Sequence, residues 1–194
     1  MKAWTIQRKE RYDILVRDGV LTASWAELFS KLDEYDKKTY GRAYSWLIAQ
    51  YNKRIGRLRQ PPIWLNLQPH TEADLERKSP YILLECDIPS NIALSLDSTN
   101  WYDVLSNAPF CSEKYISEPG NNSAYEAEYE YLSKNRKAKR QSWEKVFDLG
   151  LGKRGNMYIG AECIVPELRL DWILNTIELP VLTDEEWRLK KNYK

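Results

Sequence analysis

Apolar and polar residues alternate at a period of two in several short stretches, which is the pattern of strands with one buried face. The clearest stretch is residues 81–88, where Leu84 and Cys86 belong to an apolar face while Glu85 and Asp87 belong to a polar one. The same alternation predicts further strands at residues 3–7, 63–67, 92–96, 157–165 and 177–179.

Other stretches repeat their apolar residues every three or four positions, which indicates amphipathic helices. The most regular one covers residues 40–55, with Tyr44, Leu47 and Tyr51 on one stripe and Gly56 behind it. Tyrosines on such a stripe are typical of packing, although a hydroxyl at its end can reach a cleft. Further helices are predicted from Lys9 to a stop at Gly19, at 24–32 behind Ser24, at 101–105 behind the capping residues 97–100, at 125–147 as one helix or a pair, near 170–174, and from Thr183.

The stretch that bears most directly on function is residues 157–165. Cys163 and Val165 fall on its core face, while Glu162 falls on the other face with Gly160 two residues before it. A glycine in the middle of a strand often marks the close approach of a ligand or of another backbone. Glu162 therefore lies at the floor of a site, or else it points into water from an edge strand.

Composition describes an ordinary soluble protein with a surplus of large aromatic residues. The chain has 194 residues, of which 43% are hydrophobic and 29% charged, and no linker-like stretch divides it, so we expect residues 1–194 to form a single domain. Eight tryptophans and thirteen tyrosines exceed what a small core needs. They either line a recognition surface or lie half-buried between sheet and helices.

The formal net charge of +1 excludes a global basic field, so any contact with nucleic acid must be local. Basic residues cluster behind the helix predicted at 40–55 and again within 134–140. Each cluster can be a solvated surface, the first of them complementing a helix dipole, or it can be a phosphate contact. The residues that would make such a contact are Arg54, Arg57, Arg59, Lys137 and Arg140.

The chain offers little for metal or nucleophilic chemistry. Its three cysteines are widely spaced, and we expect them to be reduced residues of the core. Because His70 is the single histidine, we predict no metal site and no catalytic triad. The glycine-rich residues 150–155 lack the Ser or Thr of a phosphate loop and are predicted to form a turn. Without a signal peptide or an apolar run of about 20 residues, we expect a cytoplasmic protein with no membrane partner.

Five blocks together resemble an uncharacterised family of bacterial proteins, a domain of unknown function whose members open with Trp-Thr-Ile-Gln. The blocks span most of the chain in the expected order, although the family implies no activity. They are Trp4-Thr-Ile-Gln7, Ala43-Tyr-Ser-Trp46 with Arg54-Ile-Gly56, Pro62-Ile-Trp64, Leu96-Asp97 with Trp101 and Leu105-Ser-Asn107, and Ser142-Trp143 with Val146-Phe-Asp-Leu149.

More distantly, both ends of the chain resemble the ADP-ribosyltransferase fold, in particular the DNA-targeting bacterial toxins. Those enzymes begin with a strand that carries a polar motif, followed by a helix and a glycine. This chain is similar, with Trp4-Thr-Ile-Gln7 in the strand and Gly19 after the helix. They place a catalytic glutamate in a strand of the form Ala-Glu-x-Leu-Val-Pro, which Ala161-Glu-Cys-Ile-Val-Pro166 is similar to. The toxins usually show His or Arg in the first strand, where this chain has Thr5 and Gln7.

The resemblance implies an α+β fold with a mixed, split β-sheet flanked by helices. It also implies NAD as co-substrate, no metal, and transfer of ADP-ribose to a nucleic acid or protein acceptor. Glu162 would be the catalytic carboxylate, with Thr5 and Gln7 on an opposing strand. The aromatic faces that would flank the nicotinamide or a target base are Tyr44, Trp64 and Tyr158.

Two hypotheses from other functional classes stay open. The protein could be a non-catalytic module that recognises a nucleotide or a nucleic-acid end through its aromatic residues and basic clusters. It could also bind only protein, for example as an accessory in phage or host-defence conflict, with exposed tryptophans as anchors. Salt dependence of binding separates the first from NAD turnover, because phosphate contacts weaken steeply with salt.

Overall fold

The computed structural model describes residues 1–69, 80–111, 122–149, 160–181, 183 and 185. The strands are β1 (Lys2–Arg8), β2 (Val20–Leu21), β3 (Ile63–Asn66), β4 (Tyr81–Asp87), β5 (Leu94–Asp97), β6 (Ala161–Val165), β7 (Leu168–Arg169) and β8 (Ile173–Glu178). The α-helices are α1 (Lys9–Asp18), α2 (Trp25–Phe29), α3 (Glu34–Arg54), α4 (Ser98–Leu105), α6 (Asn122–Lys134) and α7 (Arg136–Ser142), and the 3₁₀ turns are η2 (Ser90–Ile92), η3 (Trp143–Phe147) and η4 (Leu170–Trp172).

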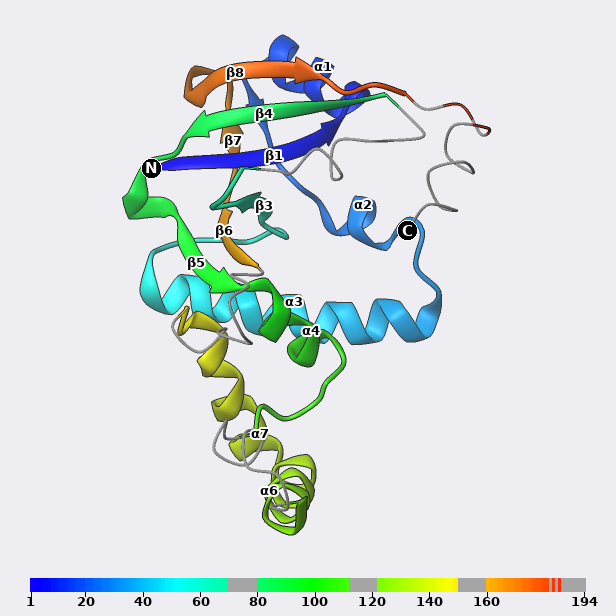
Figure 1. Cartoon of the computed structure of the whole chain (residues 1–194), viewed down its shortest axis with the longest axis vertical. Coiled ribbons are helices and arrows are strands. Elements are labelled where there is room, and N and C mark those ends of the chain that lie inside the picture. The colour runs from blue at the N-terminus through cyan, green and yellow to red at the C-terminus, as the bar shows by residue number, and fades with distance from the viewer. Residues whose placement is uncertain (70–79, 112–121, 150–159, 182, 184, 186–194) are drawn as a thin grey trace.

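Six strands form the main sheet in the order β5-β6-β3-β1-β4-β8 (Figure 1). β1 pairs with β4 along its whole length, but with β3 only where Trp4 lies opposite Asn66, so the sheet is split between β1 and β3. Every pairing between the described strands is antiparallel. The predicted strand-and-helix class is therefore confirmed, whereas the expected mixed sheet is wrong, because alternation along a strand carries no information about its neighbour's direction.

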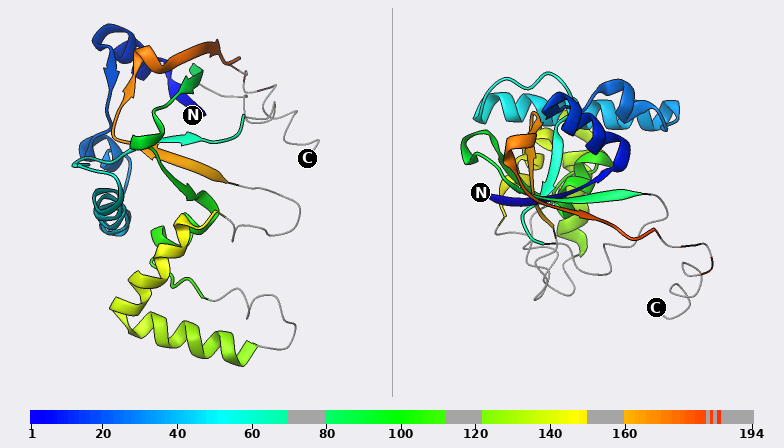
Figure 2. Two further views of the ribbon diagram at one scale, coloured as in Figure 1. Left: turned by 90° about the vertical axis from the view of Figure 1, so that its left-hand side faces the viewer. Right: turned by 90° about the horizontal axis from the view of Figure 1, so that it is seen from above.

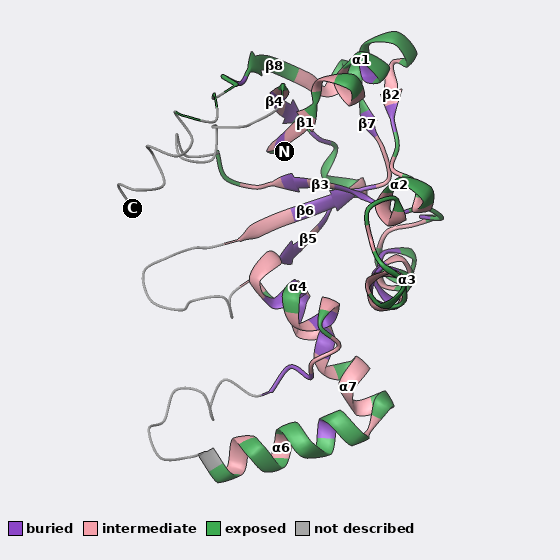
Figure 3. Ribbon diagram, turned by 90° about the vertical axis from the view of Figure 1, so that its right-hand side faces the viewer, coloured by how far each residue is buried: buried purple, intermediate pink, exposed green. Residues whose placement is uncertain are grey.

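Each face of the main sheet buries its own hydrophobic core (Figure 3). Cys163 and Val165 of β6 pack on one face with Leu15 of α1. Ile164 points to the opposite face, where Leu47 of α3 is a core residue. Because residues next to each other in a strand alternate between faces, the core of α1 and the core of α3 are separated by the sheet itself. α6 and α7 lie away from the sheet, beyond α4 and β5 (Figure 2).

Capping residues set several helix boundaries where the sequence predicts them. Gly19 ends α1 with φ 74°, and Ser24 accepts a hydrogen bond from the Glu27 N–H at 3.2 Å. α3 begins earlier than its apolar stripe, at Glu34, because Asp33 caps it by accepting a hydrogen bond from the N–H of Asp36. The polar first turn of α3 leaves no periodic signal, which is why the pattern places the start at residue 40.

The chain after β6 departs most from the predicted elements. β7 pairs with β2 as a two-residue ladder, which is too short for any periodicity to reveal. The helix predicted near 170–174 is the single turn η4, and β8 follows it directly from Ile173. The charged helix predicted at 125–147 is a pair, α6 and α7, followed by η3. The structure does not describe the turn predicted at 150–155 or the beginning of the predicted strand at 157–159. Of the helix expected from Thr183, it describes only residues 183 and 185.

Candidate functional site

Glu162 lies in the interior of the main sheet. β6 runs between β5 and β3, and Glu162 is paired with Leu96 on one side and with Asn66 on the other. Asn66 is in turn paired with Trp4 of β1. Directly opposed residues of antiparallel strands share a face, so Leu96, Glu162, Asn66 and Trp4 form one row, here called the Glu162 row. The interpretation of Glu162 as an outward residue of an edge strand is therefore wrong.

The carboxyl group of Glu162 sits in an environment that disfavours its charge. Its side chain is partly buried on the face that carries the α3 core, and burial raises the pKa of Glu162 to about 7. The nearby carboxylate of Asp97 raises this pKa further, because two like charges oppose one another. A carboxyl group with such a pKa can both give and accept a proton near neutral pH.

Gly160 positions Glu162 by letting α4 approach the start of β6. Its φ is +102°, and its carbonyl accepts a hydrogen bond from the N–H of Ser98 at 2.7 Å. A Cβ atom at this position would lie 2.2 Å from Ser98 Oγ. Asp97, which is 4% exposed, caps α4 by accepting hydrogen bonds from the N–H groups of Thr99 and Asn100. The sequence predicts that a ligand or another backbone approaches this glycine closely, and the structure shows that the N-terminus of α4 does so.

Aromatic rings cover the same face beside the Glu162 row. The centroid of Trp101 lies 5.4 Å from that of Trp64 and 5.5 Å from that of Tyr44. Burial raises the pKa of Tyr44 to about 12, a shift that the indole of Trp64 opposes and the charge of Glu162 increases. The amide nitrogen of Asn100, next to Trp101 in α4, is buried and has no hydrogen-bond partner among the described residues. The wall therefore combines apolar rings with a Tyr44 hydroxyl that stays protonated at neutral pH.

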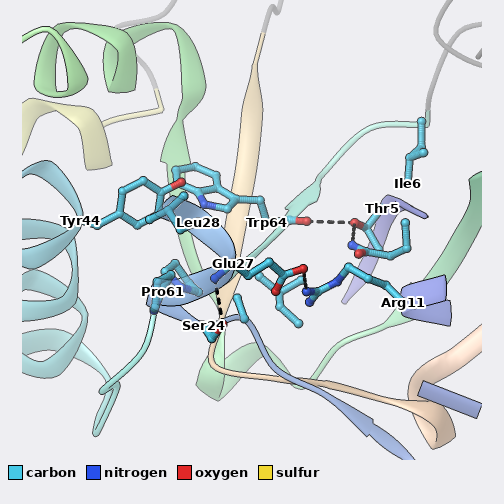
Figure 4. A pocket seen from close by; sticks show the side chains of 13 residues that line it. Thr5, Ile6, Arg11, Ser24, Glu27, Leu28, Tyr44, Pro61 and Trp64 are labelled. Carbon is cyan, nitrogen blue, oxygen red and sulfur yellow. Dashed lines mark hydrogen bonds and ion pairs between the residues drawn. The ribbon is translucent and has the colours of Figure 1, made fainter. Parts of the chain in front are cut away.

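Four of the predicted cofactor-binding residues line one pocket of about 330 Å³ (Figure 4): Thr5, Gln7, Tyr44 and Trp64. Gln7 Nε2 donates to Thr5 Oγ1 at 2.8 Å, and Thr5 Oγ1 donates to the carbonyl oxygen of Trp64 at 3.0 Å. An ion pair between Arg11 and Glu27 lies on the opposite wall. The hydroxyl of Thr5 therefore ties β1 to β3 at the split in the sheet.

Glu162 does not line this pocket, although Tyr44 and Trp64 of its lining belong to the core on the Glu162 face. Trp4 belongs to the Glu162 row, so Thr5 and Gln7 point to the other face of β1. The structure thus groups Thr5 and Gln7 with Tyr44 and Trp64 but separates them from Glu162. Asn66, which the sequence analysis did not select, lies directly opposite Glu162, and Trp4 lies one strand further along the same row. The available signal for Asn66 was a polar residue in an apolar strand. Tyr158 lies outside the described residues.

The predicted basic residues divide between two places. Lys137 and Arg140 line a groove of about 490 Å³ between α3 and α7, and Arg54 reaches the rim of that groove through an ion pair with Glu144 at 3.4 Å. Arg57 and Arg59 are exposed in the segment after α3 and do not line the groove. The whole lining consists of Trp46, Gln50, Arg136, Lys137, Arg140, Gln141 and Glu144.

The described part of the chain contains no group of three or more His, Cys, Asp or Glu side chains placed to hold a metal ion. Its cysteines are buried and unpaired, and burial raises the pKa of Cys86 and of Cys163 to about 12, which keeps both thiols protonated. His70 is not among the described residues. Of the helices in the described ranges, none has the length and apolar character needed to cross a bilayer.

Comparison with known proteins identifies the family of this chain but no individual relative. No curated protein and no solved structure matches it. One family model matches residues 2–174, a span that includes β1, the Glu162 row and the groove between α3 and α7. The expectation of an uncharacterised family is thereby confirmed, and the chain belongs to the family described as a domain of unknown function, DUF3841.

Proposed function

We propose that this protein binds NAD and transfers ADP-ribose, with Glu162 as the catalytic carboxylate. The observation that carries the proposal is the placement of Glu162: a partly buried carboxyl group inside a split sheet, in one row with Asn66 and Trp4. Its pKa of about 7 leaves a large fraction of carboxylate at neutral pH. The acceptor is a nucleic acid or a protein.

The chemistry requires one carboxylate and no metal. The bond between the ribose anomeric carbon and the nicotinamide nitrogen breaks, and nicotinamide leaves with the electron pair. The carboxylate of Glu162 stabilises the positive charge that develops on the ribose. An oxygen or nitrogen of the acceptor then bonds to the anomeric carbon, and its proton passes to Glu162.

The arrangement of the main sheet supports this assignment. The resemblance to the ADP-ribosyltransferase fold implies a first strand with a recognition motif and a glutamate in the strand before the last. Here β1 and β6 both adjoin β3, one on each side of it, so the two strands are close in space. In this proposal Asn66 and Trp4, which share a row with Glu162, contact the nicotinamide ribose. Thr5 and Gln7 serve instead to hold β1 against β3.

Release of nicotinamide and transfer of label from NAD test the proposal. Purified protein is incubated with NAD and with DNA, RNA or host proteins in turn, beside a Glu162→Gln variant that keeps the shape of the side chain. We expect the variant to lose at least about 100-fold in rate, since it removes the carboxylate from the reacting centre. Glu178→Gln, on an exposed position of β8, is the matched control and should retain full activity.

Two results would overturn the proposal. One is the absence of nicotinamide release with every acceptor, together with no heat of NAD binding in calorimetry. The other is turnover that is equal in the wild type and in Glu162→Gln. Either result leaves Glu162 as a buried residue of a binding module.

A further inference from the structure

A row of side chains on α3 faces α7 and η3 across the groove described above. Arg42, Trp46, Gln50 and Arg54 recur at every fourth residue of α3, so they lie along one side of the helix. Trp46 and Gln50 line the groove, and Arg54 stacks on the ring of Phe147 at 4.3 Å. We call this groove, with Arg42 and Lys139 beside it, the basic groove.

Burial and neighbouring cations together lower the pKa values of two cations in the basic groove, Arg42 and Lys139. Burial lowers the pKa of Arg42, Tyr35 acts in the opposite direction, and Arg140 and Arg136 lower it further. Burial likewise lowers the pKa of Lys139, and Arg42 and Arg140 add to that effect. These cations therefore lie close enough together to repel one another.

The groove contains one carboxylate, and that group is already shared. Glu144 lies 3.4 Å from Arg54 and 3.7 Å from Lys53. Within the described ranges, no carboxylate forms an ion pair with Arg42, Lys137 or Arg140. The Nε atom of Arg42 is also buried without a hydrogen-bond partner among those residues. A bound anion would satisfy this donor and offset the repulsion between the cations.

We propose that the basic groove binds the phosphate backbone of a nucleic acid, independently of Glu162 and of NAD. Arg42 and Arg54 are twelve residues apart, which corresponds to about 18 Å along a helix. Phosphates of one strand of a duplex rise by about 3.4 Å each along its axis, so a row of this length can reach more than one phosphate. Cations at both ends of this row and on the facing α7 fit a repeating anion better than a single phosphate group.

The lining of the groove also indicates what kind of contact is made. Gln50 and Gln141 flank the cations, while the one lining aromatic residue, Trp46, is 7% exposed and packs against Trp143. A membrane surface would need exposed apolar side chains beside the cations, and base recognition would need an exposed ring for stacking. The basic groove therefore contacts the phosphate backbone of the nucleic acid and should show little preference for base sequence.

Fluorescence anisotropy with labelled duplex and single-stranded oligonucleotides of mixed sequence, without NAD, tests the proposal. Arg136→Gln, Lys137→Gln and Arg140→Gln are combined in one variant. We expect it to bind at least about 30-fold more weakly in 50 mM salt and to reduce the slope of log K against log salt by about 2 to 3. The control removes three cations elsewhere (Lys2→Gln, Lys9→Gln, Arg17→Gln) and should bind like the wild type.

Glu144→Gln provides a test in the opposite direction. It removes the carboxylate of the groove, so we expect nucleic acid to bind about 3- to 10-fold more tightly at low salt. Glu85→Gln, which removes a carboxylate from β4, should leave binding unchanged. A gain of affinity cannot result from misfolding, so this pair keeps the test valid if the triple variant is unstable.

Three outcomes would overturn the inference. They are no binding of either oligonucleotide at low salt, equal binding by the triple variant and the wild type, and stronger binding to phosphatidylserine vesicles or to a phosphorylated peptide than to nucleic acid. Glu162→Gln should bind nucleic acid normally. Failure of the transferase proposal and failure of this one are therefore separate results.

Discussion

Glu162 and the basic groove both hold charge that the surrounding protein does not neutralise, but they do so in different settings. Glu162 is one carboxyl group beside an aromatic wall, and burial is the main cause of its raised pKa. The basic groove gathers several cations near the surface, where their summed charge creates a local field. Burial of a single group adjusts proton transfer, whereas crowding of like charges at a surface attracts a polyanion.

The largest effect should come from changing how Glu162 is positioned. In Gly160→Ala the new Cβ would meet Ser98 Oγ at a backbone φ of +102°. We expect a loss of about 3 kcal/mol in the free energy of unfolding, from strain together with the displaced start of α4. Urea unfolding measures this loss, and nucleic-acid binding should persist in the folded fraction.

Gly56→Ala is the control for that substitution. No atom lies within 4 Å of a Cβ added at Gly56, and its φ is not positive. This variant should be as stable as the wild type or more stable, by up to about 1 kcal/mol. A Gly160→Ala protein that unfolds like Gly56→Ala would show that α4 does not hold the start of β6.

The pH dependence of stability should report on the burial of Glu162. The ordinary pKa of a glutamate side chain is 4.5, whereas that of Glu162 in the folded protein is about 7. The folded state therefore prefers the protonated form. This preference is fully present below pH 4.5 and is lost as the pH rises through 7. Glu162→Gln cannot ionise, so it should match the wild type at pH 4 and exceed its stability at pH 8.

The expected difference at pH 8 is about 2 kcal/mol, which is less than the full shift would give because the side chain is partly exposed. Urea denaturation at several pH values between 4 and 8 measures it. Equal stability of the two proteins at pH 8 would contradict the burial of this carboxyl group. The proposed transferase activity should rise over the same range as Glu162 ionises.

A smaller effect is expected at the split between β1 and β3. Thr5 is 3% exposed, and Thr5→Val removes the hydroxyl that joins Gln7 to the carbonyl of Trp64. We expect a loss of about 1 kcal/mol in the free energy of unfolding, since a donor and an acceptor lose their partner. Thr5→Ser keeps the hydroxyl and is the control. If Thr5→Val abolished NAD binding without lowering stability, Thr5 would be a ligand contact.

The smallest effect should be a gain of stability in the basic groove. Arg140 is one of the cations that lower the pKa of Arg42 and of Lys139, so Arg140→Gln relieves repulsion. We expect Tm to rise by about 1 to 2 °C at low salt and the difference to vanish at high salt, where such interactions are screened. A fall in Tm at low salt would mean that another group already compensates Arg140.

The sequence by itself determined the local structure and the face that each strand residue occupies. Alternation separates Glu162 from Cys163, and capping chemistry places Gly19 after α1 and Asp97 before α4, because these choices depend on neighbours along the chain. Membership of the uncharacterised family was also readable from the blocks of the chain.

Only the tertiary structure decided which of those faces meet. The pairing of Trp4 with Asn66, and of Asn66 with Glu162, puts Trp4 rather than Thr5 in the row that contains the carboxyl group. The basic groove likewise combines a row of α3 with residues of α7 that lie far away in sequence. A period of two or of 3.6 gives the direction of a side chain within its own element, but register and packing between elements are long-range properties.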